Sequence, residues 1–236
     1  GVYTRPWVRV HGTKDYYDMG ALVRQYPDVH VTFNFTPVLI RQIQDYLENG
    51  AKDLYWVMAE KPAAELTEEE QRFILERFFD VNWKKILARY PRFQELLDKR
   101  GNGDAASINK ALETFTEQDY RDLQIWFNLA WFDPSILADQ PLKALVDKGE
   151  GFSEEDKQIV FDHVLKVMGE ILPLHADMQQ AGQIEVITTP YAHPILPLIT
   201  NTALQQVGNP ASELPDPFMY PADAVVHLEK SVEIYE

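Results

Sequence analysis

The sequence predicts a helix-rich α/β fold, an incomplete barrel of strands and helices interrupted by a long helical insertion. Two stretches, residues 29–35 and 184–189, have the apolar and β-branched composition of strands. From residue 90 to 174, strand signals are nearly absent while helix-start signals recur. Because two clear strands cannot close a barrel, we expect the architecture to be incomplete.

The first element pair is a strand followed by a helix. Residues 29–35 alternate β-branched and aromatic side chains, as a strand does. Thr36 then caps a helix with Pro37 at its first position, and Asn49-Gly50 ends it. The apolar positions of this helix are Leu39, Ile40, Ile43, Tyr46 and Leu47.

Capping signals predict the helices that follow. A hydroxyl residue stands three positions ahead of an acid, before apolar periodicity, at Thr67 with Glu70, Thr116 with Asp119, and Ser153 with Asp156. Pro221 opens a last amphipathic helix.

Composition bounds the class of protein and its partners. The 236 residues are 45% apolar and 25% charged, which is typical of one soluble globular domain or a large part of one. A formal charge of −15 repels nucleic acid and anionic membranes, but it does not exclude a neutral polyol substrate. No apolar run approaches the roughly 20 residues that span a bilayer. No export signal is visible, which favours a cytoplasmic location.

The sequence contains no motif for a metal site, a serine nucleophile or a nucleotide-binding loop. Cysteine is absent, so neither disulfide nor thiolate chemistry is available. The six histidines are scattered without metal-ligand spacing, and no G-x-S-x-G or phosphate-binding glycine loop occurs. We therefore predict neither a metal site nor a cofactor.

The segment 182–198 is the most informative stretch. It predicts a short buried strand that brings a carboxylate, Glu185, an aromatic, Tyr191, and an imidazole, His193, to one edge before three prolines stop further pairing. A charge within an apolar strand needs a partner or a ligand. The alternative to a ligand is an ion pair of Glu185 with Arg9 or another buried base.

This segment resembles a known family. Gly182-Gln183-Ile184-Glu185 is similar to the Gly-Gln-(Leu/Ile)-Glu region of glycoside hydrolase family 57, which contains α-amylases, amylopullulanases and 4-α-glucanotransferases. Residues 5–19 and 31–37 resemble early barrel segments of the amylopullulanase-like members, and residues 124–134 resemble the central helical insertion. The resemblance covers nearly the whole chain.

The resemblance implies a fold and a function. It implies that residues 1–236 are part of a catalytic domain with an incomplete (β/α)7-type barrel and a helical insertion at about residues 60–180. The implied parent enzyme is a retaining glycoside hydrolase or glucanotransferase that acts on starch, pullulan or maltooligosaccharides. The implied partner is therefore an α-glucan oligosaccharide or polysaccharide.

The catalytic motifs of the family are not in this sequence. The family pattern has a His-Gln-Pro motif on the first strand, a Trp-x-x-Glu nucleophile motif and a later aspartate acid/base. Trp56 and Glu60 are one residue too far apart for the nucleophile motif, and their surroundings predict helix. We therefore expect no catalytic residue and no activity in the isolated chain. Open sheet edges predict association with copies of the chain or with the rest of the catalytic domain.

The resemblance implies a substrate-binding role for the segment around Glu185. Glu185 is expected to support substrate binding and not to act as the nucleophile. His193, fixed by Pro194, is expected to donate to a sugar hydroxyl or to Glu185, although a lone loop histidine is more often a plain hydrogen-bonding residue. Gln183 and Tyr191 belong to the same set.

A second set of candidates comes from the N-terminal region and the insertion. Trp7 and His11 are placed beside the substrate in one interpretation, and in a helix-entry loop capped by Asp15 or Asp18 in the other. An aromatic cluster follows in the insertion, and such clusters are core more often than sugar-stacking surface. Its members are Trp126, Phe127, Trp131 and Phe132. Trp131 and Asp133, just before a helix-stopping proline, are the pair expected to face a cleft.

Overall fold

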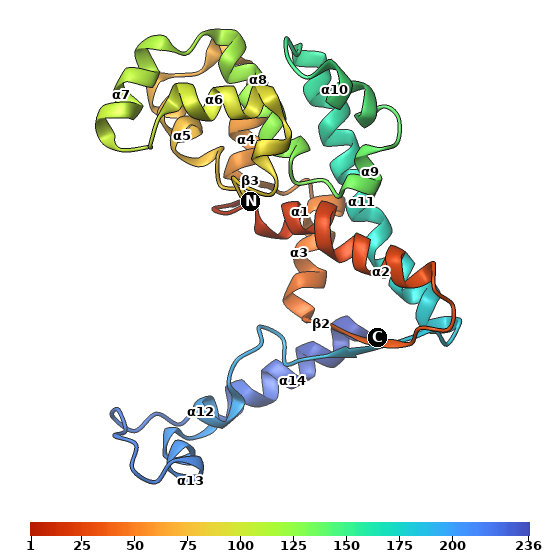
Figure 1. The fold of residues 1–236 in the computed structure, drawn as a ribbon. Helices are drawn as coiled ribbons and strands as arrows, with labels where there is room; N and C mark the ends of the chain where they lie inside the picture. Colours follow the sequence, from red (N-terminus) through yellow and green to blue (C-terminus); the bar gives the residue numbers. More distant parts are fainter. The chain divides into compact units, whose positions relative to one another are not determined.

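The computed structural model describes residues 1–236 and divides them into two compact units (Figure 1). Unit 1 comprises residues 1–21 and 46–171, and unit 2 comprises residues 22–45 and 172–236. The sequence predicts a single partial domain over the same residues. The boundaries between the units fall within helices α2 (Tyr17–Arg24), α3 (Pro37–Glu48) and α11 (Glu154–Gln180).

Unit 1 is built almost entirely from helices. Its strands β1 (Val2–Tyr3) and β3 (Lys52–Asp53) form one short parallel pair. Its other elements are α1 (Trp7–His11), the π-helical turn η1 (Gly12–Tyr16), α4 (Leu54–Glu60), η2 (Ala63–Glu65), α5 (Glu68–Arg77), η3 (Leu87–Arg89), α6 (Pro91–Arg100), α7 (Ala105–Thr114), α8 (Glu117–Leu129), α9 (Pro134–Leu137) and α10 (Leu142–Lys148). Every regular element from residue 54 to 180 is helical.

Helix α8 is the core of unit 1, because it is buried over most of its length. Trp126, Phe127 and Phe132 are almost fully buried. These three members of the predicted aromatic cluster therefore belong to the core and not to a sugar-stacking surface. The predicted capping boxes at Thr67 and Thr116 are both present. The backbone N–H of Ser153 donates to Asp156 (2.8 Å), as the spacing predicts.

A buried charge network joins the N-terminal helix to this core. The Arg9 guanidinium donates to Asp53 (Nε to Oδ2, 2.6 Å) and to the Asn128 carbonyl oxygen (2.6 Å), and the Tyr46 hydroxyl donates to Asp53 (3.0 Å). Burial of a charge is tolerated where it is paired and hydrogen-bonded in this way. The alternative that pairs Arg9 with Glu185 is therefore wrong, since Asp53 is the partner.

Unit 2 is organised around one parallel strand pair. Strand β2 (Val31–Phe35) pairs with β4 (Ile184–Thr188), with Thr32 opposite Glu185. The remaining elements are α12 (Leu196–Thr200), η4 (Thr202–Leu204), α13 (Gln205–Gly208) and α14 (Pro221–Tyr235). Helix α14 is tied to the end of β4, because the Ser231 hydroxyl donates to the Thr189 carbonyl (2.6 Å) and the Tyr235 hydroxyl to that of Val186 (2.7 Å).

The predicted strands and the helices that begin at Pro37 and Pro221 are confirmed. The prediction that β4 is buried is wrong beyond its first residue, because Glu185 and Ile187 are exposed. With only one neighbouring strand, neither face of this short pair is fully covered. The four strands of residues 1–236 form two separate pairs and do not close a barrel.

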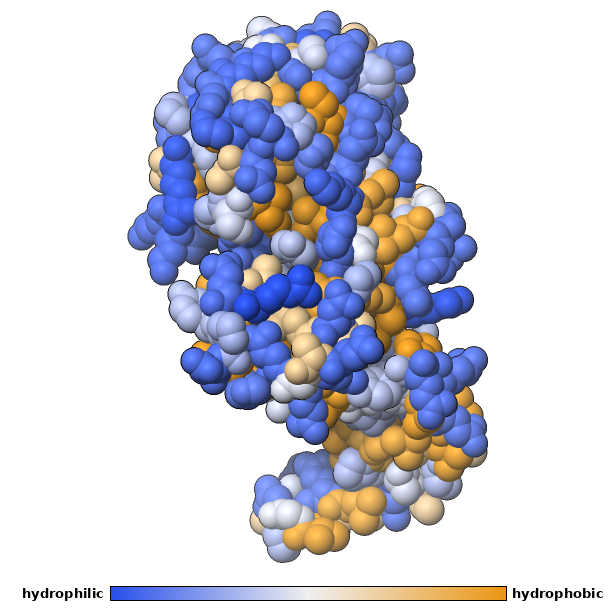
Figure 2. Space-filling view, turned by 90° about the vertical axis from the view of Figure 1, so that its right-hand side faces the viewer, coloured by the Kyte–Doolittle hydropathy of each residue, from blue (hydrophilic) through white to orange (hydrophobic).

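Unit 2 exposes many large apolar side chains. Apolar surface is visible in Figure 2. The exposed hydrophobic residues of unit 2 include Phe218, Met219, Tyr220, Val225, Val226, Leu228 and Val232. All seven lie on or just before α14. No helix of residues 1–236 combines the length and the apolar character that crossing a bilayer requires.

Candidate functional site

The N-terminal aromatic residues lie on helix, which corrects the predicted helix-entry loop. Residues 7–24 run through α1, η1 and α2 without an intervening loop. Asp15 does not cap a helix start, and its carboxylate instead bonds His11 Nδ1 at 2.5 Å, one turn away. A π-helical turn of this kind adds a residue to the turn and is frequent at functional sites.

The sequence-predicted residues Trp7, His11 and Trp131 are brought together. The His11 ring centroid lies 5.4 Å from that of Trp131 and 6.4 Å from that of Trp7, and the two indoles meet edge-on at 6.2 Å. The Thr13 hydroxyl donates to the Trp131 carbonyl (3.1 Å) and fixes the segment after α8 against η1. Trp131 therefore lies outside the buried core around α8 and packs against the side chains of the N-terminal helix.

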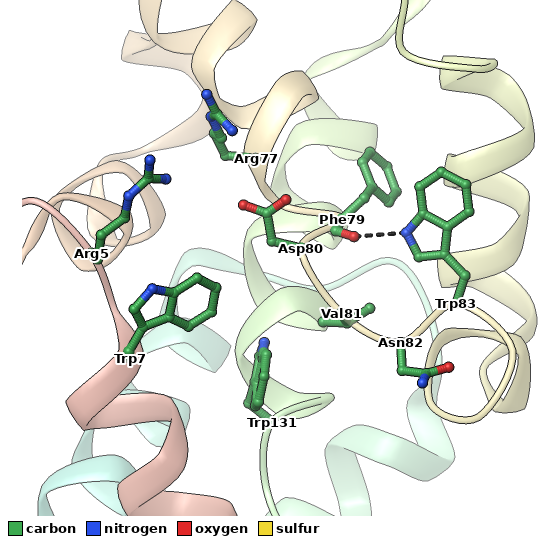
Figure 3. Close-up of a pocket in the computed structure, with 9 residues that line it drawn as sticks. All are labelled: Arg5, Trp7, Arg77, Phe79, Asp80, Val81, Asn82, Trp83 and Trp131. Carbon is green, nitrogen blue, oxygen red and sulfur yellow. Dashed lines mark hydrogen bonds between the residues drawn. The ribbon is translucent and has the colours of Figure 1, made fainter. Parts of the chain in front are cut away.

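Trp7 and Trp131 form one wall of an open depression of about 710 Å³. We call it the tryptophan depression, and it is lined by Arg5, Trp7, Arg77, Phe79, Asp80, Val81, Asn82, Trp83 and Trp131 (Figure 3). Trp7 and Trp83 are 42% and 45% exposed, so both indoles offer ring surface to a ligand. Trp83 is held in place by its Nε1–H, which donates to the Phe79 carbonyl (2.8 Å).

Asp80 is the one carboxylate that lines the depression. It accepts a hydrogen bond from the Tyr55 hydroxyl (2.9 Å), which in turn accepts one from Arg5 Nη1 (3.3 Å). Burial and the neighbouring Asp80 raise the pKa of Tyr55, so this hydroxyl stays a donor at neutral pH. The buried Trp131 Nε1–H, by contrast, has no hydrogen-bond partner within the protein.

This arrangement suits binding and not double displacement. A retaining glycosidase needs two carboxyl groups about 5 Å apart, and the depression contains one. Exposed indoles stack on the apolar C–H faces of sugar rings, while carboxylate, amide and guanidinium groups bond the hydroxyls at the ring edge. The tryptophan depression offers both kinds of contact.

Asp133, the last predicted residue of this region, has a structural role. Its carboxylate caps α9 by accepting from the Ser135 backbone N–H (2.8 Å) and hydroxyl (2.7 Å). Desolvation and the nearby Asp133 raise the pKa of Asp18. Asp133 does not line the tryptophan depression.

The predicted residues of unit 2 occupy the two ends of β4, and we call the whole set the strand edge (Gln183, Glu185, Tyr191 and His193). At the start of the strand, the exposed Glu185 accepts from the Thr32 hydroxyl (3.2 Å) beside a shallow hollow of about 270 Å³. The Gln183 amide donates to the carbonyls of Val23 (2.8 Å) and Tyr26 (3.1 Å). Gln183 thus ties the end of α2 to β4.

Tyr191 and His193 follow the other end of the strand. The Tyr191 carbonyl accepts from the Val38 N–H (3.0 Å), and Lys230 Nζ lies 5.3 Å above its ring. His193 is exposed, with a φ of 52° in a turn closed onto Pro190. Because a strand advances about 3.3 Å per residue, the structure does not bring His193 to Glu185.

Sequence reasoning missed Arg5, Asp80, Asn82 and Trp83. The available signal is the stretch from residue 80 to 83, which places an acid, an amide and a tryptophan between two helices without apolar periodicity. Exposure of Trp83 depends on how the segment after α5 turns, and no local pattern specifies that.

Comparison with known proteins assigns the family. The profile of Glycosyl hydrolase family 57 matches residues 1–236, the whole chain. The chain therefore belongs to glycosyl hydrolase family 57, and its function is of the glycoside hydrolase or glucanotransferase kind, with a carbohydrate substrate. The family implies a (β/α)7-like fold. A search of curated proteins gave no match, and neither did a search of solved structures.

Proposed function

We propose that this protein takes part in the retaining hydrolysis or transfer of α-glucans, and that the present chain supplies sugar-binding groups without the two reacting carboxylates. The main support for this proposal is the tryptophan depression, where three indoles lie beside Asp80, Asn82 and two arginines. The family membership supports the carbohydrate, and the single carboxylate in the depression supports a binding role.

In this proposal the tryptophan depression of unit 1 is the principal contact with the glucan. The strand edge of unit 2, taken by itself, offers Glu185 and His193 as separate groups that bond sugar hydroxyls. Trp7 and Trp131 stack on the sugar rings, and His11, held by Asp15, keeps the two indoles in place. Glu185 accepts from a sugar hydroxyl, since its carboxylate is exposed and bonded only to the Thr32 hydroxyl.

Calorimetric titration of the chain with maltoheptaose tests the proposal. We expect binding that weakens about tenfold or more in Trp7→Ala, because the variant loses both the stacking of the ring, about 0.5–1.5 kcal/mol, and the apolar area that the ring buries. Trp126→Phe is the matched control, since Trp126 is buried core. Absence of maltoheptaose binding by the unaltered chain contradicts the proposal. A reducing-sugar assay on starch is expected to show no hydrolysis by the chain.

A second candidate function is that of a non-catalytic carbohydrate-binding or assembly module of the same family. The exposed apolar residues on and before α14 favour the assembly role, because contiguous apolar surface marks interaction sites. Light scattering at several protein concentrations, combined with the maltoheptaose titration, distinguishes the assembly role from the sugar-binding role. Association without maltoheptaose binding favours assembly, and binding by a monomer favours the sugar-binding role.

A further inference from the structure

The tryptophan depression carries positive charge, in contrast to the chain as a whole. The sequence has a formal charge of −15, yet Arg5 and Arg77 both line the depression. Neither guanidinium makes an ion pair, and Arg77 makes no hydrogen bond through its side chain, whereas Arg9, Arg92 and Arg121 are all paired with acids. Figure 3 shows both groups on the same side of the depression as the Asp80 carboxylate.

A third arginine lies behind the wall of the depression. Arg100, the last residue of α6, is only 5% exposed, and its Nε has no hydrogen-bond partner. Its guanidinium carbon lies 4.8 Å from the ring centroid of Phe79 and 5.6 Å from that of Trp83, two residues that line the depression. Desolvation lowers the pKa of Arg100, as expected for a buried cation without a paired carboxylate.

The position of Arg100 is built into the fold. Gly103 follows α6 with a φ of +85°, and a Cβ there would lie 1.9 Å from Arg100 Nη1. A side chain at this position would force the Arg100 guanidinium to shift, and the positive φ itself favours glycine. Asp80 acts on Arg100 from beyond ion-pair distance, and this carboxylate already accepts from Tyr55.

Two arginines therefore line the depression with one partly engaged carboxylate, and a third lies behind its wall. A guanidinium presents a planar fork of N–H donors that fits phosphate and carboxylate oxygens, and a cavity with an excess of one sign of charge concentrates ligands of the opposite sign. A phosphate ester offers three terminal oxygens, enough for forks approaching from Arg5 on the N-terminal segment and Arg77 on α5.

We propose that the tryptophan depression recognises an α-glucan that carries a phosphate ester, with Arg5 and Arg77 bonding the phosphate and the indoles of Trp7, Trp83 and Trp131 holding the sugar rings. This inference rests on the proposed function, because it takes the depression as the glucan site. Arg100 contributes a fixed positive field behind Trp83 and does not touch the phosphate.

The test compares a phosphorylated maltooligosaccharide with the same oligosaccharide after phosphatase treatment, by calorimetric titration of the full chain at low salt. The phosphorylated form is expected to bind about tenfold or more tightly, and the preference is expected to shrink as salt is raised. Arg77→Gln removes most of the preference. Arg89→Gln, a change of another exposed and unpaired arginine, leaves the preference intact.

The outcomes separate this inference from the proposed function. Equal affinity for the two oligosaccharides overturns the phosphate proposal and leaves α-glucan binding standing. Binding of neither oligosaccharide overturns both. A preference that persists unchanged in the Arg5→Gln, Arg77→Gln double variant also overturns the proposal, because the phosphate would then be held elsewhere.

Discussion

The tryptophan depression and the strand edge differ in how their side chains are held. In the depression, Trp7, Trp83 and Trp131 are fixed by ring contacts and hydrogen bonds to a helical core. At the strand edge, Glu185 is exposed and bonded to one hydroxyl, and His193 lies on an exposed turn. The Gly-Gln-Ile-Glu motif is thus the clearest signal in the sequence, while the proposed binding surface with the better fixed side chains is the tryptophan depression, of which the sequence indicates only Trp7 and Trp131.

The largest effect of a single substitution on the free energy of unfolding is expected in unit 1, in the charge network that holds α1. Asp53→Ala leaves the buried Arg9 without its carboxylate and the Tyr46 hydroxyl without its acceptor. We expect the free energy of unfolding to fall by about 3–5 kcal/mol, as measured by urea denaturation. Lys52→Ala, which removes only an exposed pair with Glu60, is the control and should cost at most about 1 kcal/mol.

Unit 1 should also give the chain an acid-sensitive component of stability. Burial acts to raise the pKa of Asp119, but hydrogen bonds from Lys99, Thr116 and Arg92 outweigh it and lower the pKa to about 2. The folded pKa is below the ordinary value of 3.8, so this stability is complete above about pH 4 and is lost as the pH falls through about 2.

Asp119→Asn is expected to remove about 2 kcal/mol at pH 7 and to flatten the dependence of stability on pH between 4 and 2. Denaturation midpoints at several pH values measure both effects. Asp147→Asn, at an exposed pair with Lys143, is the control. An unchanged pH profile in Asp119→Asn would show that the network around Arg92 is not the source.

At the strand edge we expect a substitution that raises the stability of the chain, whereas the substitutions in unit 1 lower it. His193→Gly places a residue without a Cβ at a φ of 52°, so we expect a gain of about 0.5–1 kcal/mol in the free energy of unfolding. Thermal unfolding measures it. A loss of stability would mean that the imidazole makes a contact that holds the turn.

The smallest effect is expected at Glu185. Glu185→Gln keeps the shape of an exposed side chain and changes only its bond with Thr32, so stability should move by less than about 0.5 kcal/mol. Any loss of maltoheptaose affinity in this variant can then be assigned to ligand contact. A large loss of stability would mean that the bond between Glu185 and Thr32 holds β4 to β2 more strongly than an exposed hydrogen bond should.

Sequence patterns within a few residues predict where helices and strands begin, whereas the arrangement of the candidate site residues depends on tertiary packing. The hydroxyl–acid spacing at Thr67 and Thr116 specifies helix starts through bonds within four residues, so the sequence alone was enough. The meeting of His11 with Trp131 spans well over a hundred residues, and it depends on the π-helical turn at Gly12–Tyr16 that no capping rule indicates. The exposure of Glu185 was mispredicted because strand composition does not reveal how many strands cover it.

Maltoheptaose affinity in two matched variants tests the central claim most directly. The account predicts that the Trp7→Ala, Trp83→Ala double variant abolishes binding, while the Glu185→Gln, His193→Gly double variant weakens it only several-fold. The contradicting result is the reverse, with binding retained after loss of the two indoles and lost after change of the strand edge. That result would make the strand edge, and not the tryptophan depression, the principal glucan contact of this chain.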